Sequence, residues 1–148
     1  MYGSILIATD GSELASKAVV QGISLAKQLN ARVWITTVTE AWSSSDLARA
    51  ARRGNQNPIG QYEEMVTAAA ANILEGAAEV AKAAGVKVET VHVRDQHPAE
   101  GIIAAAKDKA CDLIVMASHG RRGLASLLLG SETTKVLTHS KIPVLVCR

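Results

Sequence analysis

Apolar positions along the chain follow two different periods. Short continuous apolar runs predict buried strands, whereas segments in which apolar residues recur every three or four positions predict helices. The strand pattern occurs at residues 4–9, 32–39, 86–93, 113–117 and 142–147. The helical pattern occurs between them, at about residues 15–29, 59–84 and 98–110, and from residue 130 through residue 137. Strand and helix patterns therefore alternate along the chain.

This alternation predicts an α/β fold in which a single doubly wound, five-stranded parallel sheet is covered by helices on both faces. A length of 148 residues suits one domain, residues 1–148. In such sheets, ligands bind at the carboxyl ends of the strands. Asp10 follows the first predicted strand, Val38 lies near the end of the second, and residues 117–120 follow the fourth. The sequence therefore predicts one site that gathers these positions.

Two segments need predictions of their own. Gly85 is expected to end the helix at 59–84. The apolar spacing in that helix places the following side chains on one buried face: Met65, Val66, Ala69, Ile73, Ala77 and Val80. Residues 40–58 form a polar connection that is too long for a simple turn. This connection is either a mobile lid or partly helical, since residues 47–51 support one or two helical turns.

Composition and charge narrow the classes of function. The formal net charge is +2 and aromatic residues make up 3% of the chain, which argues against DNA or RNA as a partner. No apolar stretch is long enough for a membrane span or a secretory signal, so we expect no membrane association and a cytoplasmic protein. Cys111 and Cys147 fall at opposite ends of neighbouring predicted strands, which predicts two reduced thiols. The four histidines show no metal-ligand spacing.

The segment from Ala117 to Ser131, ASHGRRGLASLLLGS, carries the clearest chemical signal. It joins a predicted buried strand to the last predicted helix, with glycines at Gly120 and Gly130. Backbone N–H groups in such a loop, together with the positive end of a helix dipole, can surround phosphate oxygens. The segment therefore predicts phosphate binding. The chain lacks the G-x-G-x-x-G pattern of dinucleotide sites after its first strand, and it lacks a P-loop.

This segment resembles the nucleotide-binding signature of the universal stress protein family, which reads Gly, two residues, Gly, nine residues, then Gly followed by Ser or Thr. Gly120, Gly130 and Ser131 keep this spacing, and Ala117 stands at the first position. Residues 5–12 (ILIATDGS) and the closing IPVLVCR are similar to the family's first and last strands. The resemblance implies a Rossmann-like fold of the adenine nucleotide alpha hydrolase type.

The resemblance also implies that the ligand is ATP, or else ADP or AMP, with or without Mg²⁺. Asp10 would accept hydrogen bonds from the ribose, Ala8 and Val38 would flank the base, and the Val38 backbone would read the adenine edge. Met116 and Ala117 would line the ribose and the first phosphate. The phosphate tail would be held by Gly120, Arg121, Gly130, Ser131, Glu132 and Thr133. The neighbouring Thr9, Ser118, His119 and Arg122 complete the implied nucleotide-binding set.

Three positions set conditions on this implied site. Ala117 replaces the signature's first glycine: a positive φ there would strain the loop, whereas a negative φ would make the exchange nearly harmless. Ala8 stands where the family often has proline, which loosens the loop without adding a clash. Glu132 would repel the phosphates unless a divalent ion or Arg121 compensates its charge.

The implied site residues also have purely structural interpretations. Asp10 can be a turn or cap residue, Ser131 can be a helix N-cap, and Arg121 and Arg122 can belong to a solvated loop. His119 has no visible partner for general-base catalysis. We therefore expect binding rather than catalysis from these residues.

Three functions remain open at this point. We favour a small nucleotide-dependent sensor or regulator of the stress response. The second is a slow ATPase or an enzyme that phosphorylates itself on Ser131 or Thr133, and the third is a nucleotide-free dimeric interaction module. The resemblance further implies a homodimer formed through the last strand, where Ile142, Val144 and Val146 give an apolar edge.

Overall fold

The computed structural model describes residues 1–121 and 128–148. Its elements follow in the order β1 (Ser4–Ala8), α1 (Glu13–Leu29), β2 (Arg32–Val38), α2 (Ser44–Arg52), α3 (Pro58–Ala83), β3 (Val88–Val93), α4 (Pro98–Asp108), β4 (Leu113–Ala117), α5 (Ser131–His139) and β5 (Val144–Cys147). The strands run parallel in one sheet with the order β3-β2-β1-β4-β5. This arrangement confirms the predicted doubly wound α/β fold.

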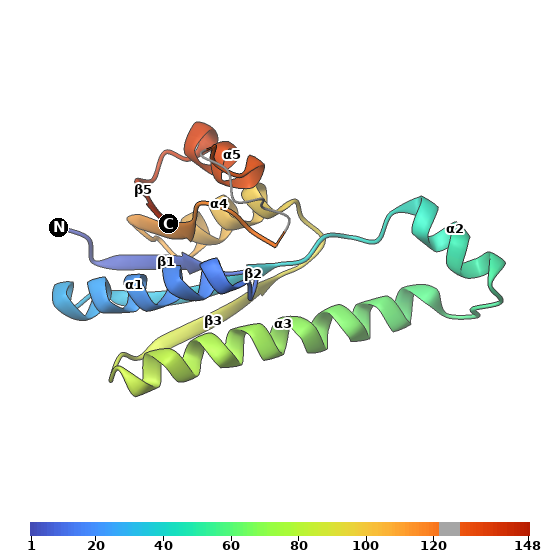
Figure 1. The fold of residues 1–148 in the computed structure, drawn as a ribbon, viewed down its shortest axis with the longest axis horizontal. Coiled ribbons are helices and arrows are strands. Elements are labelled where there is room, and N and C mark those ends of the chain that lie inside the picture. The colour runs from blue at the N-terminus through green and yellow to red at the C-terminus, as the bar shows by residue number, and fades with distance from the viewer. Residues whose placement is uncertain (122–127) are drawn as a thin grey trace.

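Helices cover both faces of the sheet (Figure 1). Alternate residues of β1 point to opposite faces, so that Ile5 and Ile7 pack in a core with α1 and α3, whereas Leu6 and Ala8 pack in a core with α4. Val136 of α5 joins the second core. Because both faces are buried, β4 is apolar at every position.

The strand order places a topological switch at the centre of the sheet. β1 pairs with β2 on one side and with β4 on the other. The connections that leave the carboxyl ends of β1 and β4 therefore diverge, which opens a crevice above these two strands. The turn after β1 and the loop after β4 both lie at this crevice, as the sequence predicted.

Most predicted element boundaries agree with the structure to within two residues. β4 has the predicted bounds, and Gly85 follows the end of α3 with a φ of 74°. β3 and β5 each begin two residues later than predicted, at Val88 and Val144. At β3 the reason is a helix-closing bond, because the N–H of Val86 donates to the carbonyl of Ala81 at 2.9 Å.

The predicted buried face of α3 is only partly right. Met65, Ala69 and Val80 are exposed. The fully buried positions of the helix are Ala70, Leu74, Ala77 and Ala81. Alanines occur all around this helix, so apolar spacing alone fits more than one face. The sheet selects the face that carries Leu74.

Residues 40–58 are partly helical, which confirms one of the two alternatives. Ser43 caps α2 by accepting the N–H of Asp46 at 3.2 Å. α2 and the first part of α3 project beyond the carboxyl ends of the strands as a helical hairpin (Figure 1). We call residues 43–66 the arm.

Both cysteines are free thiols, and both are buried. Cys111 precedes β4 and Cys147 ends β5, so they lie toward opposite ends of neighbouring strands, as predicted. Burial raises the pKa of each thiol. Among the helices of the described residues, none has the length and apolar character needed to cross a bilayer.

Candidate functional site

A cavity of about 370 Å³ opens at the carboxyl ends of β1, β2 and β4. Most of the predicted site residues line it: Ala8, Thr9, Asp10, Val38, Met116, Ala117, His119, Gly120, Arg121, Gly130, Ser131, Glu132 and Thr133. Ser118 is buried beside the cavity and does not line it. Arg122 lies outside the described residues. The structure therefore gathers residues from the turn after β1, the end of β2 and the β4–α5 connection in one place.

Asp10 joins two sides of the cavity through backbone hydrogen bonds. Its Oδ1 accepts the N–H of Ser12 at 3.0 Å, and its Oδ2 accepts the N–H of Arg121 at 2.8 Å. The first bond supports the turn interpretation, since Gly11 in this turn has a φ of 79°. The second bond reaches the loop after β4. Each carboxylate oxygen keeps a further lone pair with which it can accept a ligand hydroxyl.

Gly120 allows this close approach. A Cβ at this position would lie 2.6 Å from Oδ2 of Asp10. No real side chain tolerates that contact without displacing the carboxylate. The glycine that the sequence signature contributes here therefore serves the contact between the β4 loop and Asp10.

The end of β2 points a backbone donor and acceptor toward the cavity. The carbonyl of Thr36 accepts the N–H of Thr9 at 2.9 Å, on the β1 side of β2. Backbone groups of alternate residues point to the same side of a strand, so the N–H and C=O of Val38 also face the β1 side. β1 has already ended there at Ala8. Val38 therefore presents a donor and an acceptor side by side at the cavity.

The start of α5 supplies backbone N–H groups without a side-chain cap. The structure places Gly130 at the N-cap and Ser131 at the first helical position, so the interpretation of Ser131 as the N-cap is wrong. Gly130 has no side chain that can accept a hydrogen bond. The first helical bond runs from the N–H of Thr134 to the carbonyl of Gly130. Within the described residues no acceptor is recorded for the N–H groups of Ser131, Glu132 and Thr133, so these groups can bind another acceptor.

Thr133 fixes this helix start against β4. Its hydroxyl lies 3.0 Å from the carbonyl oxygen of Ala117 and 3.1 Å from that of Ser118, and the residue is 2% exposed. The N–H of Gly130 donates to the same Ser118 carbonyl at 2.8 Å. A Cβ on Gly130 would meet this carbonyl oxygen at 3.1 Å. Gly130 thus holds the loop against β4 through its N–H group. The absence of a side chain also leaves room at the start of the helix.

Ala117 fits its position without backbone strain. It ends β4, and it is absent from the residues with positive φ, among which the non-glycine ones are Asn30, Asp95 and Ala110. Its methyl group packs in the core beneath α1 and α3. The φ of Ala117 is therefore not positive, which is the case in which alanine can replace glycine almost without cost. The missing glycine does not distort the loop.

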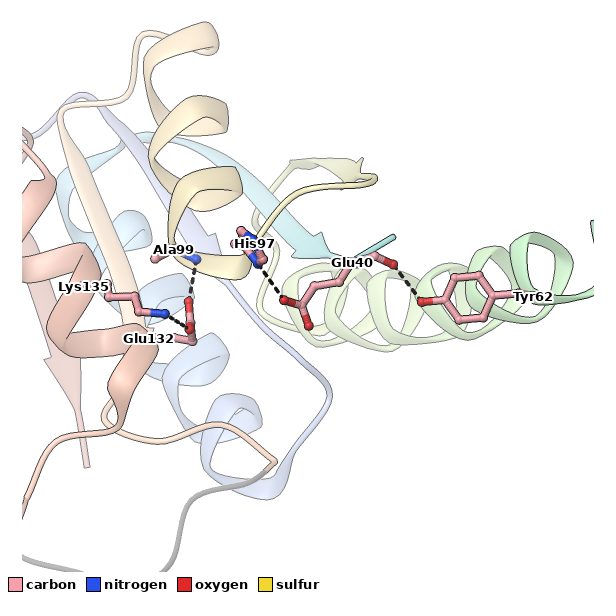
Figure 2. A network of polar contacts seen from close by, with 6 residues as sticks. All are labelled: Glu40, Tyr62, His97, Ala99, Glu132 and Lys135. Carbon is pink, nitrogen blue, oxygen red and sulfur yellow. Dashed lines mark hydrogen bonds and ion pairs between the residues drawn. The ribbon is translucent and has the colours of Figure 1, made fainter. Parts of the chain in front are cut away.

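Glu132 directs its charge toward α4. Oε2 accepts the N–H of Ala99 at 2.9 Å, and Oε1 pairs with Nζ of Lys135 at 2.9 Å (Figure 2). Partial burial alone would raise the pKa of this carboxyl, but the hydrogen bonds from Lys135 and Ala99 outweigh it and the pKa is lowered. The charge that threatened to repel phosphates is therefore balanced by α4 and Lys135 rather than by Arg121.

The base of the arm meets the same end of α4. Oε1 of Glu40 lies 3.0 Å from Nδ1 of His97, the residue before α4, and the carbonyl of Glu40 accepts the Tyr62 hydroxyl at 2.7 Å (Figure 2). The hydrogen bond to Glu40 raises the pKa of His97. Sequence reasoning missed Glu40 as well as Pro98, Ile102 and Thr36, which also line the cavity. No motif links these positions, because three separate elements bring them together.

His119 and Arg121 are two further polar residues that line the cavity. Nδ1 of His119 forms a hydrogen bond with the hydroxyl of the adjacent Ser118, at 3.1 Å. The Arg121 guanidinium lies near Gly11, since a Cβ on that glycine would be 3.3 Å from Nη2. Within residues 1–121 and 128–148, no three His, Cys, Asp or Glu side chains are grouped so that they could hold a metal ion.

Comparison with known proteins identifies the family of this chain. A model of the universal stress protein family matches residues 1–148. The chain belongs to this family. Universal stress protein YxiE of Bacillus subtilis is 34% identical over 149 residues, which cover all of both chains. Universal stress protein MJ0531 of Methanocaldococcus jannaschii is 31% identical and matches all of this chain and 83% of its own length.

Solved structures of universal stress proteins share the fold. The structure of MJ0577 of Methanocaldococcus jannaschii has a TM-score of 0.80 and 30% identity, with 99% of this chain and 96% of that chain covered. A universal stress protein in complex with cAMP has a TM-score of 0.69 and 27% identity, with coverages of 99% and 97%.

Proposed function

We propose that this universal stress protein binds ATP or a related adenine nucleotide in the cavity and acts as a nucleotide-dependent regulator. The observation that carries the proposal is the presence, in one cavity, of the Val38 backbone pair and the uncapped start of α5. The first suits the donor and acceptor of an adenine edge, and the second suits phosphate oxygens. The related protein that was solved with cAMP supports an adenine nucleotide as the class of ligand.

Each part of a nucleotide has a complementary surface in the cavity. Val38, Ile102 and Met116 offer apolar contacts for the base, and the carboxylate of Asp10 offers acceptors for the ribose hydroxyls. The phosphates would lie against the N–H groups at the start of α5, near Arg121. The carboxylates of Asp10 and Glu132 already accept hydrogen bonds from the protein. Because the remaining lone pairs of Asp10 are assigned to the ribose, a Mg²⁺ ion would be held mainly by the phosphates and water.

We propose that the protein binds the nucleotide without hydrolysing it efficiently. The Thr133 hydroxyl is buried against two carbonyl oxygens, which makes it a poor phosphate acceptor. Ser131 is exposed, but no carboxylate or histidine is seen to accept its proton within the described residues. The slow ATPase therefore ranks second. The nucleotide-free module ranks third, because Ala117 leaves the loop unstrained.

We further propose that this protein is cytoplasmic and forms a homodimer through β5. β5 is an edge strand, and Leu145 on it is 39% exposed. An edge strand with exposed apolar side chains is suited to pairing with a second copy.

The nucleotide proposal is tested by analysing what the purified protein carries. The protein is denatured, the released small molecules are separated by chromatography, and the emptied protein is then titrated with ATP with and without Mg²⁺. We expect a released adenine nucleotide or saturable ATP binding. If no nucleotide is released and no binding is seen at millimolar ATP, both the regulator and the ATPase are contradicted. Phosphate release followed over hours then separates these two.

A further inference from the structure

The arm has few contacts with the rest of its own chain. α2 contains no buried residue and packs mainly against α3. A helix of nine residues is not stable by itself in water. The arm also extends past the sheet, so the helical layers of the body leave it uncovered (Figure 1). Its surface is therefore free to pack against another molecule.

An apolar stripe on the first part of α3 is only partly covered. At 100° per residue, Ile59, Tyr62, Met65 and Val66 fall within about 120° of the helix circumference. In the middle of the stripe, Tyr62 stacks on Trp42 with ring centroids 5.0 Å apart, and Val66 is half-buried. At its margins, Ile59 and Met65 are 52% and 63% exposed. Both margins remain open for further packing.

Charges on the arm are separated along its length. α2 runs outward from the body and α3 returns toward it, so the end of α2 lies at the tip (Figure 1). This end carries Arg49, Arg52 and Arg53, whereas Glu63 and Glu64 come more than a helical turn into α3, nearer the body. All five are exposed, and none forms an ion pair with another described residue. Each arm thus has a basic tip and an acidic inner part.

We propose that the arm binds the arm of a second copy of this chain, with the two hairpins side by side and antiparallel. In this arrangement the basic tip of each arm lies against the acidic inner part of the other, and a twofold axis repeats the contact. The open margin at Ile59, one helical turn from Glu63, becomes covered in the same step. Because each arm carries both charges in this order, a second copy is its matching partner.

This interface is separate from the edge at β5. The arm leaves the sheet after β2, and β1 and β4 lie between β2 and β5. Pairing of arms would therefore join copies that do not share a β5 contact. It goes beyond the nucleotide proposal and holds whether or not the cavity takes a nucleotide.

Reciprocal charge reversal tests the pairing. The double variants Arg52→Glu/Arg53→Glu and Glu63→Arg/Glu64→Arg each place like charges opposite one another in the paired arms. Their 1:1 mixture restores opposite charges at both contacts of the twofold. Sedimentation velocity over a range of concentrations measures the mass of each sample, and far-UV circular dichroism checks that both variants keep their helices.

We expect each variant alone to show a lower mass than wild type, and the mixture to recover the wild-type mass. The control Lys87→Glu/Lys107→Glu reverses two exposed charges away from the arm, and it should keep the wild-type mass. Wild-type mass in either arm variant alone would overturn the proposal. A mixture that stays as small as its components would overturn it as well.

Discussion

Asp10 and Arg121 lie 111 positions apart in the sequence, and the N–H of Arg121 donates to Oδ2 of Asp10 at 2.8 Å. This bond ties the turn after β1 to the loop after β4, which are the two sides of the topological switch. The carboxylate that we assign to the ribose therefore also holds the start of the phosphate loop. Changes at Asp10 and its neighbours are expected to affect both parts of the ligand.

Replacing Gly120 by alanine tests this link. Its Cβ would lie 2.6 Å from the Asp10 carboxylate, which must then move and lose the Arg121 bond. We expect about tenfold weaker ATP binding and a free energy of unfolding lower by about 1–2 kcal/mol. Gly76→Ala is the control, because that Cβ meets nothing within 4 Å and alanine favours the helix. Equal ATP affinity of Gly120→Ala and wild type in calorimetry would contradict the link.

Thr133→Val tests how the start of α5 is held against β4. The change removes the hydroxyl that reaches the carbonyls of Ala117 and Ser118 in a buried position. Ser118 keeps its bond from Gly130, so the cost falls mainly on the Ala117 carbonyl. We expect urea unfolding to show a loss of about 1–3 kcal/mol. The exposed Thr138→Val should lose clearly less; similar losses would show that the Thr133 contacts do not stabilise this junction.

The pair of Glu40 and His97 predicts a pH dependence at the base of the arm. The hydrogen bond to Glu40 raises the pKa of His97 above its usual value near 6.5. A raised pKa in the folded state means that the pairing stabilises the fold fully below the unfolded pKa. That contribution is lost as the pH rises through the folded pKa.

An NMR titration of the His97 ring measures this effect directly. Glu40→Gln should lower the pKa of His97 more than Glu100→Gln does, because the hydrogen bond to Glu40 is the larger cause and Glu100 acts only through its charge. A larger change with Glu100→Gln would show that the contact with Glu40 does not set the titration.

Ser131→Asp separates helix stability from phosphate binding. Residue 131 is the first residue of α5, where a carboxylate favours the helix by about 0.3–1 kcal/mol. The same negative charge would stand where the phosphates are expected. We therefore expect thermal unfolding at an unchanged or higher temperature together with at least tenfold weaker ATP binding. Ser131→Ala should bind within a few-fold of wild type, and undiminished affinity of Ser131→Asp would place the phosphates elsewhere.

The sequence predicted the parts of the site that depend on local pattern. Strand ends in a parallel sheet converge, so Asp10, Val38 and the loop after Ala117 could be placed together before the structure was known. The φ of Ala117 could not be predicted, because it depends on how far β4 continues before the loop. The bond from the Ala99 N–H to Glu132 was missed because Ala99 lies on another helix and shares no motif with Glu132.

The fold was also predictable from local pattern. The errors in its prediction arose where packing between distant segments decides the structure. Alternating strand and helix periods specified the layers, but the alanine-rich α3 fitted several faces and only packing against the sheet selected Leu74. For the arm, the sequence did not decide between a mobile lid and a helical segment. A polar segment with a few alanines gives no indication of what it packs against. In each case, the sequence does not specify which distant surface a given side chain contacts.

Discrimination between ATP and GTP tests the central proposal most directly. Adenine offers a donor and an acceptor that match the carbonyl and N–H of Val38, whereas guanine offers the reverse pattern at the same edge. Calorimetric titration of the nucleotide-free protein with each ligand, at the same Mg²⁺ and salt concentrations, is predicted to give saturable ATP binding and at least tenfold weaker GTP binding. Equal affinities, or no heat of binding with millimolar ATP, would contradict it.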